Sequence, residues 1–285
     1  MMKIAIDIGG TFIKAGAIDD QHTIHSYQKI ETPHNKDGGI VEAVKEIVES
    51  YTKEFNLNKP EVGISTAGVV DSRKGEITYA GPTIPYYNGT NFKQSLADIA
   101  SNVAVNNDVS CALLGELLTF DREVKSIFLM TIGTGIGGAY YENQLLEGEK
   151  YRACEIGYLL YDKETNTTYE DRGSTNALKR LISANYKEDV QVEKLFDLAY
   201  QNDEKAQDIL NQWAKHVAEG IAQVQIMFDP EIILIGGGIS QQEVRLLSLI
   251  EPFIDDYLPT DYGHAKIEVT SKGNDSALYG AISSL

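Results

Sequence analysis

A formal net charge of −17, from 42 acidic and 25 basic residues in a chain of 285, argues against a nucleic-acid partner, because contact with a phosphate backbone needs clustered Lys and Arg. No apolar run is long enough to span a bilayer, so we expect no membrane partner. The two cysteines, Cys111 and Cys154, stand far apart, and no secretory pattern precedes the first strand. We therefore expect a cytoplasmic protein without disulfides.

The first part of the chain alternates strand and helix patterns. Apolar spacing predicts strands over 3–7 and 11–18 joined as a hairpin, a helix over 40–51, a strand over 61–65, a helix over 92–99 and a strand over 103–105. A further helix begins at Asp108, which we expect to act as its N-cap.

The second part repeats this plan. The pattern predicts strands over 126–132 and 139–141, a long helix over 204–228 stopped by Asp229-Pro230, a strand over 231–235, a strand over 266–270 and a final helix over 276–285. Ser240 and Glu243 have the spacing of a capping box. The repetition predicts two similar α/β lobes that share a cleft and a hinge.

Three glycine-rich turns each follow an apolar, strand-like run. They are Gly9-Gly10-Thr11, the segment Gly133 to Gly138, and Gly236-Gly237-Gly238. One such turn alone fits a purely geometric role equally well, because glycine serves any tight turn. Three of them favour a surface of backbone N–H groups, which is how proteins hold phosphate.

The second turn also satisfies the G-x-G-x-x-G pattern of dinucleotide-binding proteins, but its context denies that interpretation. That motif opens a helix, whereas Ala139 to Asn143 reads as the return strand of a hairpin. Asp7, directly before the first turn, is a candidate to orient Mg²⁺ through water; the alternative is a carboxylate that hydrogen-bonds its own turn.

Several motifs together resemble the ROK family (repressors, open reading frames and kinases). They are Ile6 to Thr11, Asn107-Asp108, Thr131 to Gly138, Cys154 to Gly157, Asp229 to Gly238 and Asn274 to Ala281. The resemblance implies an α/β protein with an actin-like ATPase (ribonuclease H-like) fold, its two lobes placed around a cleft. It also implies ATP-dependent phosphorylation of a hexose at its 6-hydroxyl. We expect a small lobe over 1–110, completed by the helix at 273–285, and a large lobe over 111–272.

Site residues follow from the resemblance by position. Asp108 is the expected catalytic base, although a helix N-cap is the plain alternative. Glu155 would be an ordinary solvated residue if it does not bind sugar. The expected sugar-binding residues are Gly68, Asn107, Asp108, Glu155, Tyr158 and Glu170.

The nucleotide is expected to be ATP with Mg²⁺, the metal held by Asp7 through water. The expected ATP-binding residues are Asp7, Gly9, Gly10, Thr11, Lys14, Gly133, Thr134, Gly135, Gly137, Gly236, Gly237 and Gly238. The three glycines of the last turn would let the adenosine lie against the backbone.

Two departures from the family pattern concern zinc and substrate. The family usually has a histidine where Tyr158 stands, followed by a cysteine-rich, zinc-binding loop, but residues 159–169 contain no cysteine. We therefore expect no zinc site. The change at Tyr158 favours a substrate with an addition at C1 or C2, a β-glucoside or N-acetylmannosamine, while glucose and fructose stay open.

Two rival functions remain. A transcriptional repressor of this family would carry a helix-turn-helix domain ahead of the first strand, which here begins at residue 3. A sugar sensor or assembly protein without catalysis would not need an intact Asp108 and three phosphate turns. Family members are often dimers, and the sequence leaves the oligomeric state open.

Overall fold

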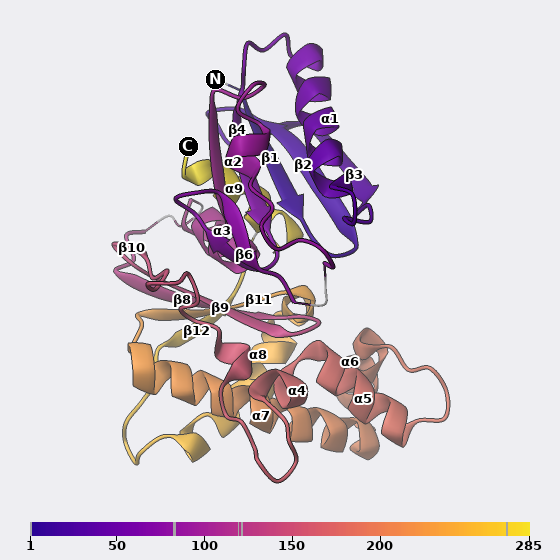
Figure 1. The fold of residues 1–285 in the computed structure, drawn as a ribbon. Coiled ribbons are helices and arrows are strands. Elements are labelled where there is room, and N and C mark those ends of the chain that lie inside the picture. The colour runs from indigo at the N-terminus through magenta and orange to yellow at the C-terminus, as the bar shows by residue number, and fades with distance from the viewer. Residues whose placement is uncertain (1, 82–83, 119, 121, 272) are drawn as a thin grey trace. The chain divides into compact units, whose positions relative to one another are not determined.

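The computed structural model describes residues 2–81, 84–118, 120, 122–271 and 273–285. The chain divides into two compact units (Figure 1). Unit 1 contains Met1–Asp121, Glu147–Ala153 and Asn274–Leu285, and unit 2 contains Arg122–Leu146 and Cys154–Gly273. The lobe limit expected at residue 110 falls inside α3 (Asp108–Leu117), which lies whole in unit 1.

Unit 1 is built on a five-stranded sheet of order β3-β2-β1-β4-β7. The strands are β1 (Lys3–Ile8), β2 (Phe12–Ile18), β3 (Ile24–Glu31), β4 (Glu61–Thr66) and β7 (Asn102–Asn107). The first three are antiparallel neighbours, so the predicted hairpin at the first glycine turn is confirmed. Strands β4 and β7 run parallel to β1, which brings their carboxyl ends to one edge.

Helices cover both faces of this sheet because side chains alternate along each strand. Ile4, Ile6 and Ile8 of β1 pack in the core that α1 (Gly39–Glu54) completes. Ala5 packs on the opposite face with Leu278 of α9 (Ser276–Ser283), and α3 crosses α9 there. The unit also holds β5 (Val69–Asp71), β6 (Glu76–Tyr79) and α2 (Phe92–Ser95). Helix α2 is only four residues long, so it is shorter than the helix predicted over 92–99.

Unit 2 repeats the plan with a sheet of order β10-β9-β8-β11-β12. Its strands are β8 (Ser126–Ile132), β9 (Ile136–Glu142), β10 (Gln144–Leu145), β11 (Ile232–Gly236) and β12 (Lys266–Val269). Strand β9 is antiparallel to β8, while β11 is parallel to β8 and β12 parallel to β11. The second glycine turn thus closes a hairpin, as predicted, and opens no helix.

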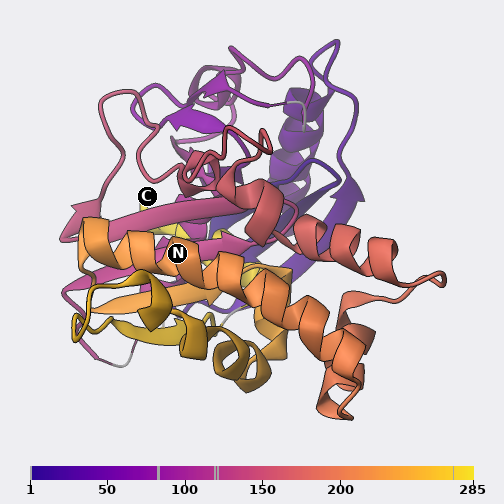
Figure 2. The ribbon, with the colours of Figure 1, turned by 90° about the horizontal axis from the view of Figure 1, so that it is seen from below.

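The long helix α7 (Glu204–Phe228) has the predicted limits, and its C-cap is Asp229, whose φ is 42°. Figure 2 shows α7 extending across the strands of unit 2. It packs against α4 (Tyr169–Gly173), α5 (Thr175–Asn185), α6 (Val192–Tyr200) and α8 (Val244–Ile250). Single 3-10 turns occupy Ile156–Tyr158, Gly238–Gln242, Glu251–Phe253, Asp255–Tyr257 and Gly273–Asp275.

The capping box predicted at Ser240 and Glu243 is wrong. Ser240 lies in the 3-10 turn, and its hydroxyl donates to the Gly237 carbonyl at 2.7 Å. Helix α8 begins only at Val244, after Glu243 at φ 48°. The glycine turn continues as a tight 3-10 turn, so the serine hydroxyl closes that turn.

In the part of the chain that the structure describes, none of the helices has both the length and the apolar character needed to traverse a bilayer.

Candidate active site

The candidate site of unit 1 lies at the carboxyl ends of the parallel strands. Asp7 of β1 stands opposite Ser65 of β4 in the register, and Ser65 stands opposite Asn106 of β7. One position further on, Thr66 is paired with Asn107. Parallel strands therefore bring Asp7 and the start of α3 to one sheet edge, although they are about a hundred residues apart in the sequence.

Asp7 is held by side chains of the two neighbouring strands. Lys14 Nζ of β2 lies 3.3 Å from Asp7 Oδ2, and the Ser65 hydroxyl donates to Asp7 Oδ1 at 2.8 Å. Burial raises the pKa of the Cys111 thiol on α3, and the charges of Asp7 and Asp108 raise it further. The charges of Asp7 and Asp108 thus act on the same thiol, and Lys14 is a cation near Asp7.

The first glycine turn is fixed at its base and exposed at its tip. Gly9 N–H donates to the Phe12 carbonyl at 3.0 Å, and the Thr32 hydroxyl donates to the Gly9 carbonyl at 2.7 Å. Gly10 and Thr11 are exposed. A fixed turn with an exposed backbone tip is the arrangement that a phosphate-binding turn needs.

Asn107, and not Asp108, caps α3, so that part of the prediction is wrong. The Asn107 side-chain oxygen accepts from the N–H of Val109 at 2.9 Å and of Ser110 at 3.3 Å. Asp108 is the first residue of the helix, because Asn107 has the extended backbone that an N-cap requires. The Asp108 side chain is half-buried, and its Oδ1 accepts from Val109 N–H at 3.0 Å.

The Asn107 amide also joins Gly68 to Asp108. Its Nδ2 donates to the Gly68 carbonyl and to Asp108 Oδ1, both at 2.9 Å. Gly68 has φ +101°, and a Cβ there would lie 2.7 Å from the Tyr79 carbonyl oxygen. Glycine is required at this turn, and the structure brings Gly68, Asn107 and Asp108 together.

In unit 2 the second and third glycine turns adjoin. Gly236 pairs with Thr131 across the parallel strands β11 and β8. Gly237 has φ +84°, and a Cβ there would overlap the Ile132 carbonyl group. Glycine is thus required at 237, and a Cβ on Gly236 would lie 3.1 Å from the Thr270 side chain. Among the residues that the structure describes, a Cβ on Gly238 would meet nothing within 4 Å.

Glu170 of α4 reaches the second turn. The N–H of Ile136 donates to Glu170 Oε2 at 3.2 Å. A Cβ on Gly157 would lie 3.1 Å from the same oxygen, and a Cβ on Gly135 would overlap it. Among the expected residues of unit 2, Gly135 and Glu170 are therefore in direct proximity, although the resemblance assigned them to different substrates.

Glu155 precedes the 3-10 turn that follows Cys154, and Tyr158 is the last residue of that turn. Glu155 is exposed between the buried residues Cys154 and Ile156, and Tyr158 is 59% exposed. A Cβ on Gly138 would lie 2.6 Å from the Cys154 carbonyl oxygen, so this segment packs directly on β9. Burial raises the pKa of the Cys154 thiol to about 11, which keeps it protonated and unreactive at neutral pH.

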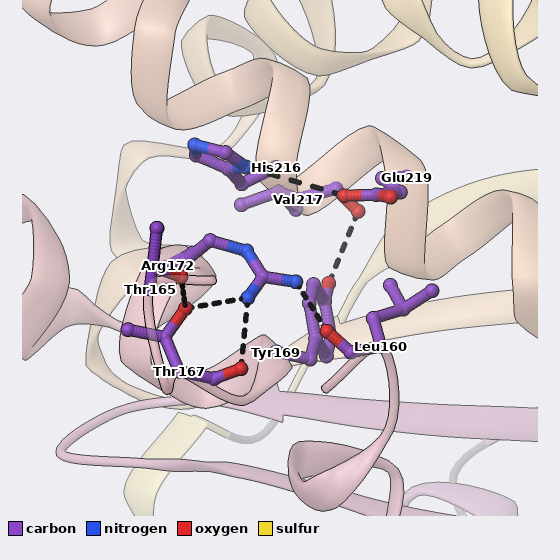
Figure 3. A network of polar contacts seen from close by, with 8 residues as sticks. All are labelled: Leu160, Thr165, Thr167, Tyr169, Arg172, His216, Val217 and Glu219. Atoms are coloured by element: carbon purple, nitrogen blue, oxygen red, sulfur yellow. Dashed lines mark hydrogen bonds and ion pairs between the residues drawn. The ribbon is translucent and has the colours of Figure 1, made fainter. Parts of the chain in front are cut away.

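The short helix α4 is anchored to α7 through Tyr169. Its ring is fully buried, and its hydroxyl donates to the Val217 carbonyl at 3.0 Å (Figure 3). Gly220 makes room for this ring, because a Cβ there would overlap it. Trp213 Nε1 donates to the Gly173 and Ser174 carbonyls at 3.0 and 3.1 Å. These contacts fix the backbone from which Glu170 projects.

Arg172 of α4 holds the loop that precedes the helix. Its guanidinium donates to the Leu160 carbonyl at 2.6 Å, to the Thr167 carbonyl at 3.1 Å and to the Thr167 hydroxyl at 2.8 Å (Figure 3). Burial lowers the pKa of His216, and the Arg172 charge lowers it further. The charge of Glu219 acts in the opposite direction and offsets part of this shift. One side chain thus fastens both ends of the loop that begins just after Tyr158.

Replacing Arg172 with lysine is expected to lower the free energy of unfolding by about 1–3 kcal/mol, since lysine cannot serve the same acceptors in one fork geometry. Urea denaturation followed by circular dichroism measures the change. The matched control is Arg180→Lys, because Arg180 is exposed and donates to the Asp171 carbonyl. Equal effects of the two substitutions would contradict a special role for Arg172.

The sequence does not identify four residues that shape the site: Ser65, Tyr169, Arg172 and Gly220. Ser65 ends a predicted strand next to Asp7, and parallel pairing of the two strands is the signal that identifies it. Tyr169 and Arg172 flank Glu170, but their partners lie on α7 and in the preceding loop. No local pattern reveals contacts at that separation.

Comparison with known proteins agrees with this architecture. Two units that repeat one sheet order, each with a glycine hairpin between its first two strands, define an actin-like ATPase fold. The ROK family model matches residues 3–284, and the chain belongs to the ROK family.

Relatives and solved structures of the family cover nearly the whole chain. An uncharacterized protein of Clostridium perfringens is 35% identical over 97% of this chain and 95% of its own. A beta-glucoside kinase of Klebsiella pneumoniae is 27% identical (99% and 95% covered), and an N-acetylmannosamine kinase of Haemophilus influenzae is 29% identical (99% and 94%). The crystal structure of a ROK family glucokinase from Streptomyces griseus with glucose and AMPPNP is 26% identical, with a TM-score of 0.81 over 99% of this chain and 98% of that one.

Proposed function

We propose that the protein is an ATP-dependent hexose kinase that transfers the γ-phosphate to the 6-hydroxyl of its sugar. The observation that carries the proposal is the Asp108 carboxylate at the start of α3, oriented by Asn107 and by the N–H of Val109. It lies at the sheet edge that also holds Asp7 and the first glycine turn. A base and a phosphate-binding turn at one edge suit phosphoryl transfer.

Asp108 would act as the general base. As the sugar 6-oxygen forms its bond to the γ-phosphorus, its proton passes to the Asp108 carboxylate. The bond from the γ-phosphorus to the bridging oxygen breaks, and ADP leaves with that electron pair. Such a base typically contributes about 10²–10⁴-fold to the rate.

The glycine turns would hold the phosphates of ATP. Gly9 to Thr11 would serve from unit 1, with Lys14 as a nearby cation, and the second and third turns would serve from unit 2. At Gly238 the described residues place no atom within 4 Å of an added Cβ, so the adenosine would approach the backbone of the third turn there. Backbone N–H groups can hold phosphate without clustered basic side chains, which suits a chain of acidic composition.

Asp7 fits a role toward Mg²⁺ only through water. Its two oxygens already contact Lys14 and Ser65, but each carboxylate oxygen has a second lone pair, and the side chain is 14% exposed. One carboxylate beside a lysine is a weak site for the bare ion, so we expect Mg²⁺ to arrive with the ATP phosphates. When bound, the ion would neutralise charge on those phosphates.

The sugar would be held by carboxylates and amides that serve adjacent hydroxyl groups. Glu155 and Glu170 would contribute from unit 2. The Asn107 amide, which donates to the Gly68 carbonyl in this structure, would donate to a sugar hydroxyl instead. Tyr158, with 59% of its surface exposed, would lie beside a substituent on the ring. We therefore favour a β-glucoside or N-acetylmannosamine over glucose or fructose, in keeping with the names of two relatives.

This function also gives the two units their roles. We propose that unit 1 acts as the lobe with the base and unit 2 as the lobe with the second and third turns.

The use of ATP points to the cytoplasm as the place of the reaction. A homodimer is the assembly we propose, and sedimentation velocity of the purified chain tests it.

A hexose panel tests the proposal. The purified protein is incubated with Mg²⁺, ATP and glucose, fructose, N-acetylmannosamine or the β-glucosides cellobiose and arbutin, and ADP release is followed by a coupled assay. We expect turnover with at least one sugar, and ¹³C NMR of its product should show phosphate on carbon 6. ADP release that no sugar stimulates would overturn the proposal and leave a sugar sensor.

A further inference from the structure

The carboxylate of Glu170 lies against two glycine positions that are distant in the sequence. A Cβ on Gly135 would overlap Glu170 Oε2. A Cβ on Gly157 would lie 3.1 Å from the same oxygen, although it would first overlap the Ile136 carbonyl oxygen. Glu170 Oε2 accepts the Ile136 N–H at 3.2 Å. The missing side chain of Gly135 and one backbone donor thus form a seat for a single carboxylate oxygen.

The helix that carries Glu170 cannot readily move away from this seat. Tyr169, its neighbour, is fully buried over Gly220 and bonded to Val217, as Figure 3 shows for the hydroxyl. Trp213 holds the carbonyl groups at the other end of α4. A side chain added at residue 135 would therefore displace the carboxylate, which is the flexible end of Glu170, and would leave the backbone of α4 in place.

The space around Gly133, two residues earlier in the same turn, is different. Within the part of the chain that the structure describes, a Cβ there would meet nothing within 4 Å. Neither Gly133 nor Gly135 has φ in the left-handed region, so alanine is compatible with both backbone conformations. The two positions share a turn and differ in their contact with Glu170.

We propose that Gly135 is a positioning residue for the sugar rather than a contact for phosphate. Its missing side chain lets Glu170 Oε2 dock on the Ile136 N–H, which directs Oε1 toward a sugar hydroxyl. The inference rests on the proposed function, in which Glu170 binds the sugar. It revises the role of Gly135, which the motif alone places with ATP.

Four variants test this role: Gly135→Ala, Gly133→Ala, Glu170→Ala and the double variant Gly135→Ala/Glu170→Ala. With the sugar that the wild type turns over, Gly135→Ala should raise the KM for sugar about 10- to 100-fold, the range for a lost hydrogen bond to a charged group. Its kcat, its KM for ATP and its calorimetric affinity for AMPPNP should stay within about threefold of the wild type, because binding of the sugar alone is weakened.

The double-mutant cycle supplies the decisive comparison. Without the Glu170 carboxylate, Gly135→Ala has nothing to displace, so it should change the KM for sugar by less than about twofold in that background. Gly133→Ala introduces no contact with Glu170. Any effect of it should therefore fall on the KM for ATP, where the proposed function places Gly133, and not on the KM for sugar.

Two results would overturn the inference. One is a Gly135→Ala protein that loses AMPPNP affinity with an unchanged KM for sugar, which returns Gly135 to the phosphate. The other is an equal effect of Gly135→Ala with and without Glu170. In both cases the wild type still phosphorylates its sugar, so the proposed function stands. A wild type that binds AMPPNP but no hexose would overturn the proposed function and this inference together.

Discussion

Replacing Asp108 with asparagine is expected to leave the fold intact and to reduce sugar-dependent ADP release about 10²–10⁴-fold. Asparagine keeps the shape of the side chain, and its oxygen can still accept the Val109 N–H that Asp108 accepts at 3.0 Å. Helix α3 keeps its cap, because Asn107 provides it. The amide cannot take up the proton of an attacking hydroxyl, so the loss falls on kcat.

The matched control for this substitution is Asp98→Asn. Asp98 lies in unit 1 and is exposed, so its charge can be removed without touching the start of α3. We expect the control to retain wild-type kinetics. Retention of more than about a tenth of the wild-type rate by Asp108→Asn would remove this residue from the role of base, since a general base contributes far more.

Replacing Gly280 with alanine is expected to destabilise the protein by about 3 kcal/mol or more. A Cβ on Gly280 of α9 would overlap the Cys111 carbonyl group of α3, and a Cβ on Gly115 would overlap the Ser276 carbonyl group of α9. The two helices thus cross backbone to backbone through one glycine each. Neither backbone can yield without moving the helix whose first residue is Asp108.

Urea denaturation measures this effect, with Gly81→Ala as the control in the same unit. Gly81 has no left-handed φ, and none of the described residues places an atom within 4 Å of an added Cβ. The control should stay within about 0.5 kcal/mol of the wild type, as surface substitutions usually do. A Gly280→Ala protein as stable as the control would show that α3 and α9 do not pack as closely as described.

The sequence predicted the elements whose signals are local and strong. The first and second hairpins and the limits of α7 depend on apolar periodicity, on glycine turns and on Asp229-Pro230. The end of α2 was less predictable, because Leu96 and Ile99 are buried or half-buried in turns that imitate helical spacing. Periodicity alone does not separate a short helix from such turns.

The cap of α3 shows a different limit. Asn107 and Asp108 are both good N-cap residues, and the choice depends on where β7 ends. Strand β7 continues to Asn107 because it pairs with Thr66 of β4, a contact that lies outside the local sequence. The expected helix was therefore right, and its cap was off by one residue.

Glycines show the same limit within the candidate site. The sequence marks Gly135 and Gly237 as turn residues, but the groups that exclude a Cβ are Glu170 and the Ile132 carbonyl. Those partners come from a helix and from a neighbouring strand. A motif can thus place a glycine in a site without telling which substrate that glycine serves.

The proposed role of Asp108 is to activate a sugar hydroxyl for attack on ATP. A crystal structure of the ternary complex with AMPPNP, Mg²⁺ and the accepted sugar tests it most directly. We predict an Asp108 carboxylate oxygen about 2.6–3.2 Å from the sugar 6-oxygen, with the γ-phosphorus in line beyond it. A bound sugar whose 6-oxygen lies more than about 10 Å from Asp108, or is hydrogen-bonded to a different base, would contradict the account.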